Sequence, residues 1–377
     1  NNTSGNNGGG IYIDSSSPVL TDVQITNNKA AGYSGGGVYI VSGSAKFSYV
    51  TVKGNGSANG AGIYIAGGTP TFPNSIITEN IATSNGGGIY TASSSGISYT
   101  NISITKNKAA TYGGGIYTDN ATSVTHTMTN MLIAENEATS TYGGGIYFGG
   151  SSSSTIYTLT NVTVAKNKAP GSSSTGGGGI YRNSNSVNLR NSIVWGNTGG
   201  SSATTLARNI TGATVNHSYN LVEGGTVSGA TIISASNPLL GADYHLTSSS
   251  TAAIDKGYKP YITGFTPPVT TDLAGNARIQ NCELDLGAYE YDIPGGDVNP
   301  SSNKRVYVNA NIAVPGDGST WEKAYPNLAR ALSAARYIDC IDVDEIWVAE
   351  GTYYPQHIPD SAANLSNSPT SRDRTFV

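Results

Sequence analysis

The stretch Gly113-Gly-Gly-Ile-Tyr117 decides the fold, because close copies of it recur throughout residues 1–200. Seven copies of the pattern Gly-x-Gly-[Ile/Val]-Tyr, 25 to 34 residues apart, end at Tyr12, Tyr39, Tyr64, Tyr90, Tyr117, Tyr147 and Tyr181. Each copy is followed by an aliphatic residue and, three positions after it, by Asn28, Asn55, Asn80, Asn107, Asn136, Asn167 or Asn197. Internal repeats of about 20 to 50 residues indicate stacked structural units.

Each repeat is expected to form short β-strands. Segments such as Val23-Gln-Ile25 and Val162-Thr-Val164 alternate apolar and polar residues with period two, whereas Gly triplets and β-branched residues disfavour helix. A short strand cannot bury its apolar face alone, so equivalent strands should stack in parallel, about 4.8 Å apart. The sequence therefore predicts an all-β fold, a single-stranded parallel β-helix (solenoid) whose regular coils are residues 1–200.

The asparagine column predicts a ladder of side-chain amides, each hydrogen-bonded to its copies in the coils above and below. Asparagine also tolerates the left-handed conformation of a sharp corner. The flanking residues alternate in charge between coils, as Glu79, Lys106, Glu135 and Lys166 on one side and Lys108, Glu137 and Lys168 on the other. Stacking would make opposite charges neighbours.

The tyrosine column is the best candidate for function. If the Ile or Val before each tyrosine points inward, period two sends the tyrosine outward. An aromatic stripe could stack on sugar rings or form a protein-binding face, although a self-stacked ladder that stabilises the sheet is the favoured interpretation. The opposite register stays open, since an outward Tyr181 would turn Arg182 inward.

Gly-Gly-Gly-Ile-Tyr followed by Ile-x-x-Asn-x-Ala resembles the repeat of chlamydial polymorphic outer membrane proteins and of related bacterial right-handed β-helix adhesins. The resemblance covers residues 1–200 and implies a right-handed β-helix exposed outside the cell, often in adhesion. The general preference for right-handed crossovers agrees with that hand. The resemblance implies no particular ligand.

Beyond residue 200 the register fades. Residues 201–292 are expected to add irregular last coils and a C-terminal cap over the open end of the solenoid. Within them, Asp272-Leu-Ala-Gly-Asn-Ala-Arg278 and Leu284-Asp-Leu-Gly-Ala-Tyr-Glu-Tyr291 resemble the closing segment of large β-helix surface proteins from Bacteroidota and their relatives.

Residues 293–303 are rich in Pro, Gly, Asp and Ser and predict a linker. Residues 304–377 then offer a strand, a helix starting near Pro326 and further strands around residues 346–353. That order resembles the N-terminal cap and first coil of many β-helix proteins, pectin-modifying enzymes included. We expect a truncated second β-helix there, and a parent protein built as a tandem array.

Composition excludes several function classes. Only 12% of residues are charged and the net charge is −4, so no nucleic-acid or anionic-membrane partner is expected. No apolar run approaches the roughly 20 residues of a membrane-spanning helix. Cys282 and Cys340 are too few for a disulfide scaffold; two lone thiols are slightly favoured, and a bridge between them stays open.

An enzyme that cleaves polysaccharides is the main rival, and hydrolysis would need two carboxylates across one cleft. The acids of residues 1–200 are Asp14, Asp22, Glu79, Asp119, Glu135 and Glu137, which favour a solvated charge ladder instead. The histidines share no metal-ligand spacing and are expected in turns or at the surface: His126, His217, His245 and His357. The densest acidic cluster is expected to be solvated and to blunt a sheet edge: Asp339, Asp342, Asp344 and Glu345.

The sequence thus predicts no catalysis, no cofactor and no metal site. The expected function is an adhesin-like or stalk segment of a large extracellular bacterial protein, associated with the cell surface or outer membrane. Glycans or surface proteins of host or neighbouring cells are the expected partners. Two alternatives stay open: a polysaccharide-degrading lyase or glycosidase whose active site lies outside this sequence, and a purely structural spacer.

Overall fold

The computed structural model describes residues 1–92, 96–119, 123–150, 154–170, 177–200, 204–211, 215–225, 232–234, 236–264, 269–280, 283–291, 301–335 and 343–353. The chain forms two compact units, which are treated separately: residues 1–278 with 284–290, and residues 279–283 with 291–377. Of the segment 201–292, residues 279–283, 291 and 292 therefore belong to the second unit. Cys282, Cys340, His357, Asp339, Asp342 and most of the expected linker 293–303 lie outside the described residues.

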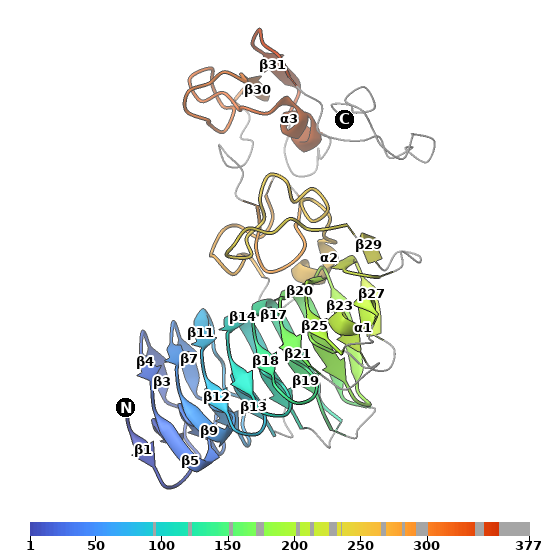
Figure 1. Ribbon diagram of the computed structural model, residues 1–377. Coiled ribbons are helices and arrows are strands. Elements are labelled where there is room, and N and C mark those ends of the chain that lie inside the picture. The colour runs from blue at the N-terminus through green and yellow to red at the C-terminus, as the bar shows by residue number, and fades with distance from the viewer. Residues whose placement is uncertain are drawn as a thin grey trace. The chain divides into compact units, whose positions relative to one another are not determined.

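The first unit is a solenoid of parallel β-strands (Figure 1), which confirms the predicted fold class. The sheet that carries the tyrosines, here the Tyr sheet, consists of β2 (Ile11–Ile13), β6 (Val38–Ile40), β10 (Ile63–Ile65), β13 (Ile89–Thr91), β16 (Ile116–Thr118), β19 (Ile146–Phe148), β22 (Ile180–Arg182) and β26 (Ile210–Thr211). Each tyrosine pairs in register with the tyrosine of the next coil.

Two further sheets complete each coil. The long sheet precedes the ladder asparagines and consists of β4 (Gln24–Thr26), β8 (Thr51–Lys53), β11 (Ser75–Thr78), β14 (Ser98–Thr105), β17 (Thr125–Ala134), β20 (Ile156–Ala165), β24 (Ile193–Trp195), β28 (Asn220–Val222) and β29 (Ile232–Ser234), with β23 (Ser186–Arg190) and β27 (Val215–Ser218) beside it. The short sheet follows the asparagines and consists of β1 (Thr3–Ser4), β5 (Lys29–Ser34), β9 (Gly56–Asn59), β12 (Ile81–Ala82), β15 (Lys108–Ala109), β18 (Glu137–Ala138), β21 (Lys168–Ala169) and β25 (Thr198–Gly199). β3 (Val19–Thr21) pairs with β7 (Lys46–Ser48).

One continuous apolar core runs along the solenoid, and every coil contributes the same kinds of side chain to it. Ile77, Ile104 and Ile133 are fully buried in the long sheet, opposite Ile89 and Ile116 of the Tyr sheet. Stacking identical strands places identical side chains above one another, so a repeated sequence produces a repeated core.

The glycine run before each tyrosine is required by close packing. A Cβ atom on Gly115 would lie 2.6 Å from the carbonyl oxygen of Gly145 and 3.1 Å from the amide of Asn136. Gly113, two residues earlier, has a φ of +65°, which favours glycine. The glycines therefore let the Tyr sheet approach the asparagine ladder.

Two corners of each coil adopt the left-handed conformation, and neither is formed by the ladder asparagines. The residue directly before each ladder asparagine has φ of 53–66°: Asn27, Gly54, Glu79, Lys106, Glu135, Lys166 and Gly196. The residue six positions before it has φ of 48–57°: Asp22, Tyr49, Asn74, Asn101, Asn130, Asn161 and Asn191. The prediction that the ladder asparagines themselves take this conformation is wrong, because the preceding residue makes the corner and turns the asparagine inward.

The last coils are irregular. A short helix, α1 (Thr205–Asn209), precedes β26, and β26, β27, β28 and β29 continue the sheets. After them, the described residues of 236–278 and 284–290, here called the lateral segment, pack against the side of the solenoid. Tyr244, Ala288 and Tyr289 cover the outward-facing Leu132 and Ala165 of β17 and β20. The contacts made by the described residues thus lie on the outer side of the long sheet. That this segment also covers the open end of the solenoid stays a prediction.

The second unit contains β30 (Arg305–Val308), α3 (Leu328–Ala335) and β31 (Glu345–Val348), in the order expected from the sequence. β30 and β31 pair in parallel, and Val306, Val308 and Tyr325 form a small core with residues of α3. Among the described residues the remaining helix is α2 (Pro260–Thr263), and no helix there is long and apolar enough to cross a bilayer.

Candidate functional site

The predicted tyrosines form one continuous column on the outside of the Tyr sheet. In β22, Ile180 and Arg182 are buried while Tyr181 between them is partly exposed, so the tyrosines point outward and Arg182 points inward. Consecutive ring centroids are 4.7–5.5 Å apart, with interplanar angles of no more than 36°. The rings are stacked along the axis of the solenoid.

This stacking decides what the column can bind. Rings stacked in parallel cover one another's faces, so an interior tyrosine offers its edge and its hydroxyl group to a ligand. Tyr12, at the start of the column, is 55% exposed. The column is therefore a row of phenol hydroxyls and a poor platform for stacking sugar rings.

A second group of tyrosines, which were not among the candidates predicted from the sequence, lies beside the column. Tyr112 and Tyr142 directly precede a glycine run. The ring of Tyr112 lies 4.5 Å from that of Tyr147 at an angle of 40°, and the ring of Tyr142 stacks on that of Tyr181 at 4.6 Å. Their signal in the sequence is the repeated Thr-Tyr-Gly-Gly-Gly at residues 111–115 and 141–145.

One carboxylate lies at the centre of this surface. The hydroxyl of Tyr90 donates a hydrogen bond of 3.3 Å to Oδ2 of Asp119, one coil further along. Burial, followed by the charge of Asp119, raises the pKa of Tyr117 to about 12 and raises the pKa of Tyr90 further. These hydroxyls stay protonated near neutral pH and act as neutral hydrogen-bonding groups.

The ladder asparagines form a buried chain of amides. Each Oδ1 accepts hydrogen bonds from the backbone N–H and from Nδ2 of the asparagine in the preceding coil, the latter at 2.8–3.1 Å. Each Nδ2 from Asn55 to Asn197 also donates to a backbone carbonyl in the preceding coil. This row of amides ends at Asn209 of α1. The repeat spacing does not predict the role of Asn209, because Asn209 comes only 12 residues after Asn197.

The charged residues beside the ladder pair across coils. Glu137 lies 3.2 Å from Lys108 and 3.8 Å from Lys168, and Glu135 lies 3.8 Å from Lys106. Glu79 pairs with Lys53 at 3.3 Å, and Lys53 lies outside the two charge columns that flank the asparagines. Three of the six carboxylates of residues 1–200, those of Glu79, Glu135 and Glu137, are thus engaged by lysines.

One histidine, His126, does not lie where the sequence predicted it. His126 is fully buried in β17, stacks on Tyr157 at 4.9 Å and accepts a hydrogen bond from the N–H of Ile97. Burial lowers the pKa of His126 to about 4. The expectation of a turn or surface position is therefore wrong for His126, because period two turns it inward with Met128. His245 pairs with Asp243 at 3.0 Å and stacks on Tyr289.

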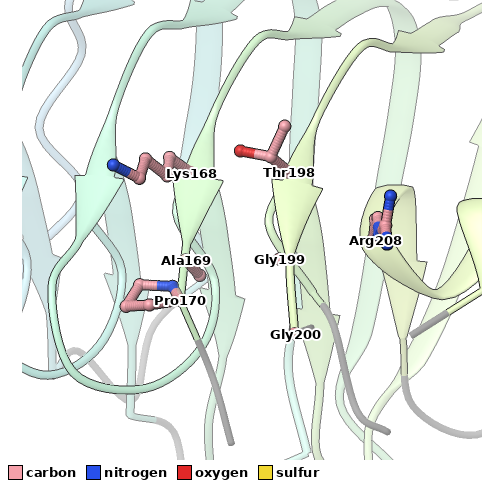
Figure 2. A pocket seen from close by; sticks show the side chains of 7 residues that line it. All are labelled: Lys168, Ala169, Pro170, Thr198, Gly199, Gly200 and Arg208. Carbon is pink, nitrogen blue, oxygen red and sulfur yellow. The ribbon is translucent and has the colours of Figure 1, made fainter. Parts of the chain in front are cut away.

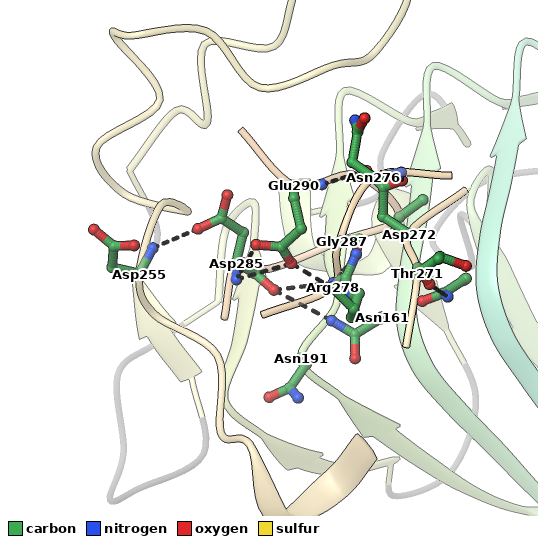
Figure 3. A network of polar contacts seen from close by, with 12 residues as sticks. Asn161, Asn191, Asp255, Thr271, Asp272, Asn276, Arg278, Asp285, Gly287 and Glu290 are labelled. Carbon is green, nitrogen blue, oxygen red and sulfur yellow. Dashed lines mark hydrogen bonds and ion pairs between the residues drawn. The ribbon is translucent and has the colours of Figure 1, made fainter. Parts of the chain in front are cut away.

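A second network of polar contacts lies in the lateral segment (Figure 3). Arg278 is fully buried, its Nε lies 3.2 Å from Glu290 and its Nη2 donates to the carbonyls of Asp285 and Gly287. The backbone N–H of Glu290 donates to the buried carboxylate of Asp272. Burial and the neighbouring Asp285 raise the pKa of Glu290 well above its usual value, and Arg278 opposes this shift.

The network also attaches this segment to the solenoid. Asn161 Nδ2 donates to the carbonyl of Asp285, Asn130 Nδ2 to that of Thr271, and Asn191 exchanges hydrogen bonds with the backbone of Tyr258. These asparagines belong to the left-handed corner column. The corner therefore has two roles, as it turns the coil and holds the lateral segment.

An open depression of about 240 Å³ lies beside the short sheet, lined by Lys168, Ala169, Pro170, Thr198, Gly199, Gly200 and Arg208 (Figure 2). Its two cations could attract an anion. Pro170 and Gly200 are each followed directly by residues outside the described ranges, so the depression is bounded only in part. Within the described residues, no group of histidines, cysteines and acids has the arrangement of a metal site.

Comparison with known proteins identifies a family but no individual relative. The family model described as right handed beta helix region matches residues 36–256. This range begins in the second coil and ends within the lateral segment. No curated protein and no solved structure matches the chain.

Proposed function

The chain belongs to the right-handed β-helix family, and we propose that it serves as a rigid, non-catalytic stalk in an extracellular bacterial surface protein. The fold alone does not decide this, because β-helices serve enzymes and non-enzymes alike. The likeness of the repeats to chlamydial polymorphic outer membrane proteins supports the extracellular location. So does the likeness of residues 272–291 to the closing segment of Bacteroidota surface proteins.

The observation that carries the proposal is the axial continuity of the solenoid. Buried amide hydrogen bonds run without interruption from Asn28 to Asn209, and a stacked aromatic column runs in parallel from Tyr12 to Tyr181. Bending the solenoid would open both sets of contacts on one side. A structure of this kind resists bending and can hold other surfaces at a fixed distance.

The surface charges favour a stalk over an enzyme. Glycoside hydrolysis needs two carboxylates, about 5 to 10 Å apart, that are free to act on one bond. Glu79, Glu135 and Glu137 each pair with lysine, and Glu135 also accepts a hydrogen bond of 2.7 Å from Tyr244. Partners of this kind hold a carboxylate in place and compete with a substrate.

The enzymatic alternative is tested with the full chain and a panel of neutral and acidic polysaccharides. Reducing ends report hydrolysis, and absorbance of unsaturated uronates reports a lyase. We expect neither signal to rise above that of heat-denatured protein. Product that accumulates in proportion to the concentration of folded protein would overturn the proposal.

A second candidate function is adhesion through the row of tyrosine hydroxyls around Asp119. The observation that favours it is the hydrogen bond between Tyr90 and Asp119, because a carboxylate among phenol hydroxyls suits a ligand rich in hydroxyl groups. A glycan array tests it with the full chain and the Tyr90→Phe/Tyr117→Phe variant, which keeps the rings and removes two hydroxyls.

The matched control for this array is Tyr39→Phe, which changes the same column away from Asp119. Binding that is lost in the double variant and kept in the control would support adhesion by the Tyr sheet. Binding that both variants keep, or no binding by the folded chain, would remove this candidate and leave the stalk.

A further inference from the structure

The second unit carries an aromatic cluster on the outer face of the β30–β31 pair. Tyr307 and Trp347 are opposite each other in the parallel register, and so are Arg305 and Glu345. Val306 and Val308, which alternate with Arg305 and Tyr307, are buried in the core of the unit. Period two therefore places these four residues on the side that faces away from the core.

The rings of the cluster do not cover one another. The rings of Tyr307 and Trp321 are 5.0 Å apart at 59°, and those of Tyr307 and Trp347 are 5.9 Å apart at 72°. Trp321 and Trp347 are 40% and 43% exposed. Large aromatic side chains grouped at a surface are typical of ligand and interaction sites.

Polar groups hold the cluster in place. Glu345 Oε2 accepts hydrogen bonds from Nε of Arg305, at 2.5 Å, and from Nε1 of Trp347, at 2.8 Å. The guanidinium of Arg305 lies 4.4 Å from the centre of the Trp347 ring. The indole of Trp347 is thus fixed from its edge and from one face, which lowers the entropy that a ligand would have to remove.

We propose that this cluster, formed by Tyr307, Trp321, Trp347, Arg305 and Glu345, binds a neutral carbohydrate. The exposed indole of Trp321 offers an apolar surface to the C–H face of a pyranose ring. Arg305 and Glu345 supply donors and acceptors for its hydroxyl groups. Since the two charges of the pair compensate each other, the site has no electrostatic preference for an anion or a cation, which favours an uncharged ligand.

The proposal is independent of the stalk function, because it concerns the second unit alone. It also differs from adhesion by the Tyr sheet, where the ring faces are covered by stacking. A second copy of the chain is the competing occupant of the exposed indoles, and the experiment distinguishes the two.

Tryptophan fluorescence of the full chain provides the test. The chain has 3 tryptophans, and Trp195→Phe removes the one in the solenoid, so the emission of that variant reports on the cluster. The variant is titrated separately with cellohexaose, xylohexaose, mannohexaose, laminarihexaose and chitohexaose. We expect a saturable shift with at least one of them, and at least about tenfold weaker binding after Trp321→Ala or Glu345→Gln.

Controls keep the outcome interpretable. Lys256→Met, at an exposed position of the first unit, should leave the affinity unchanged. Trp321→Tyr should retain part of the affinity if Trp321→Ala disturbs folding, which circular dichroism reports. Absence of a saturable response to all five sugars would overturn the proposal, as would a response that survives Trp321→Ala. So would a dimer in sedimentation analysis that Trp321→Ala dissociates, because a second copy would then be the occupant.

Discussion

The tyrosine column of the solenoid and the aromatic cluster of residues 305–353 contain similar rings in opposite arrangements. In the column, Tyr39 and Tyr64 stack at 5.0 Å with an angle of 2°, so each ring covers the next. In the cluster, Tyr307 meets Trp321 at 59° and Trp347 at 72°. Repetition places identical rings next to one another, so that they stack and cover one another's faces. Different neighbouring rings meet at an angle and leave ring faces accessible to a ligand.

The same contrast holds for buried polar groups. Asn136 is satisfied by the asparagines of adjacent coils, whereas Arg278 is satisfied by Glu290 and by two backbone carbonyls of a non-repeating segment. A group in a ladder has equivalent copies on both sides. A group in the network depends on single, unlike partners, so the loss of one should be more damaging.

The largest effect is expected from Arg278→Met. Removing the guanidinium takes the ion-pair partner from the buried Glu290 and a donor from the buried carbonyls of Asp285 and Gly287, and breaking a buried ion pair costs about 3–5 kcal/mol. Urea unfolding should show this loss, and hydrogen exchange should locate it in the lateral segment. Lys256→Met at an exposed position is the control. A loss below about 1 kcal/mol would mean that the network does not hold the segment.

The ladder is tested by Asn136→Ala. This change removes the acceptor that the backbone N–H and Nδ2 of Asn107 share, and one of the two donors to Oδ1 of Asn167, which should cost roughly 3 kcal/mol of unfolding free energy. Asn28→Ala, at the start of the ladder, should cost clearly less because fewer buried groups depend on it. Equal losses at both positions would contradict a cooperative ladder.

His126 interrupts the repetition with a titratable group in the core. The pKa of His126 is lowered to about 4, so between pH 6.5 and pH 4 the unfolded chain binds a proton that the folded chain does not. The folded state should therefore lose about 2 kcal/mol between pH 7 and pH 5, relative to His126→Phe measured in parallel. If the unfolding free energies of the original chain and of His126→Phe change equally between pH 7 and pH 5, His126 does not titrate as a buried group.

The smallest effect is expected in the tyrosine column. Tyr117→Ala removes ring contacts with Tyr90 and Tyr147 and should cost about 1–2 kcal/mol. Tyr117→Phe keeps the rings and should change stability by less than about 0.5 kcal/mol. Thermal unfolding of both variants measures the difference. A large loss in the Phe variant would mean that the hydroxyl row, and not the stack, stabilises the Tyr sheet.

The sequence by itself determined the coils and their columns. Spacing alone aligned the tyrosines, the ladder asparagines and the alternating charges at Lys108, Glu137 and Lys168, because in a solenoid the contact partner of a residue is its own copy in the next coil. Once Ile180–Arg182 is known to be a strand with Ile180 inward, alternation along it is enough to place the side chain of Tyr181 on the outside.

Only the tertiary structure decided where the non-repeating residues go. Asn130 meets Thr271 and Asn161 meets Asp285 across separations of 141 and 124 residues, and no period connects them. The burial of Arg278 and the open rings of Trp321 and Trp347 have the same origin. Contacts between unlike residues depend on the shape and chemistry of two particular surfaces, and such complementarity leaves no repeating signal along the chain.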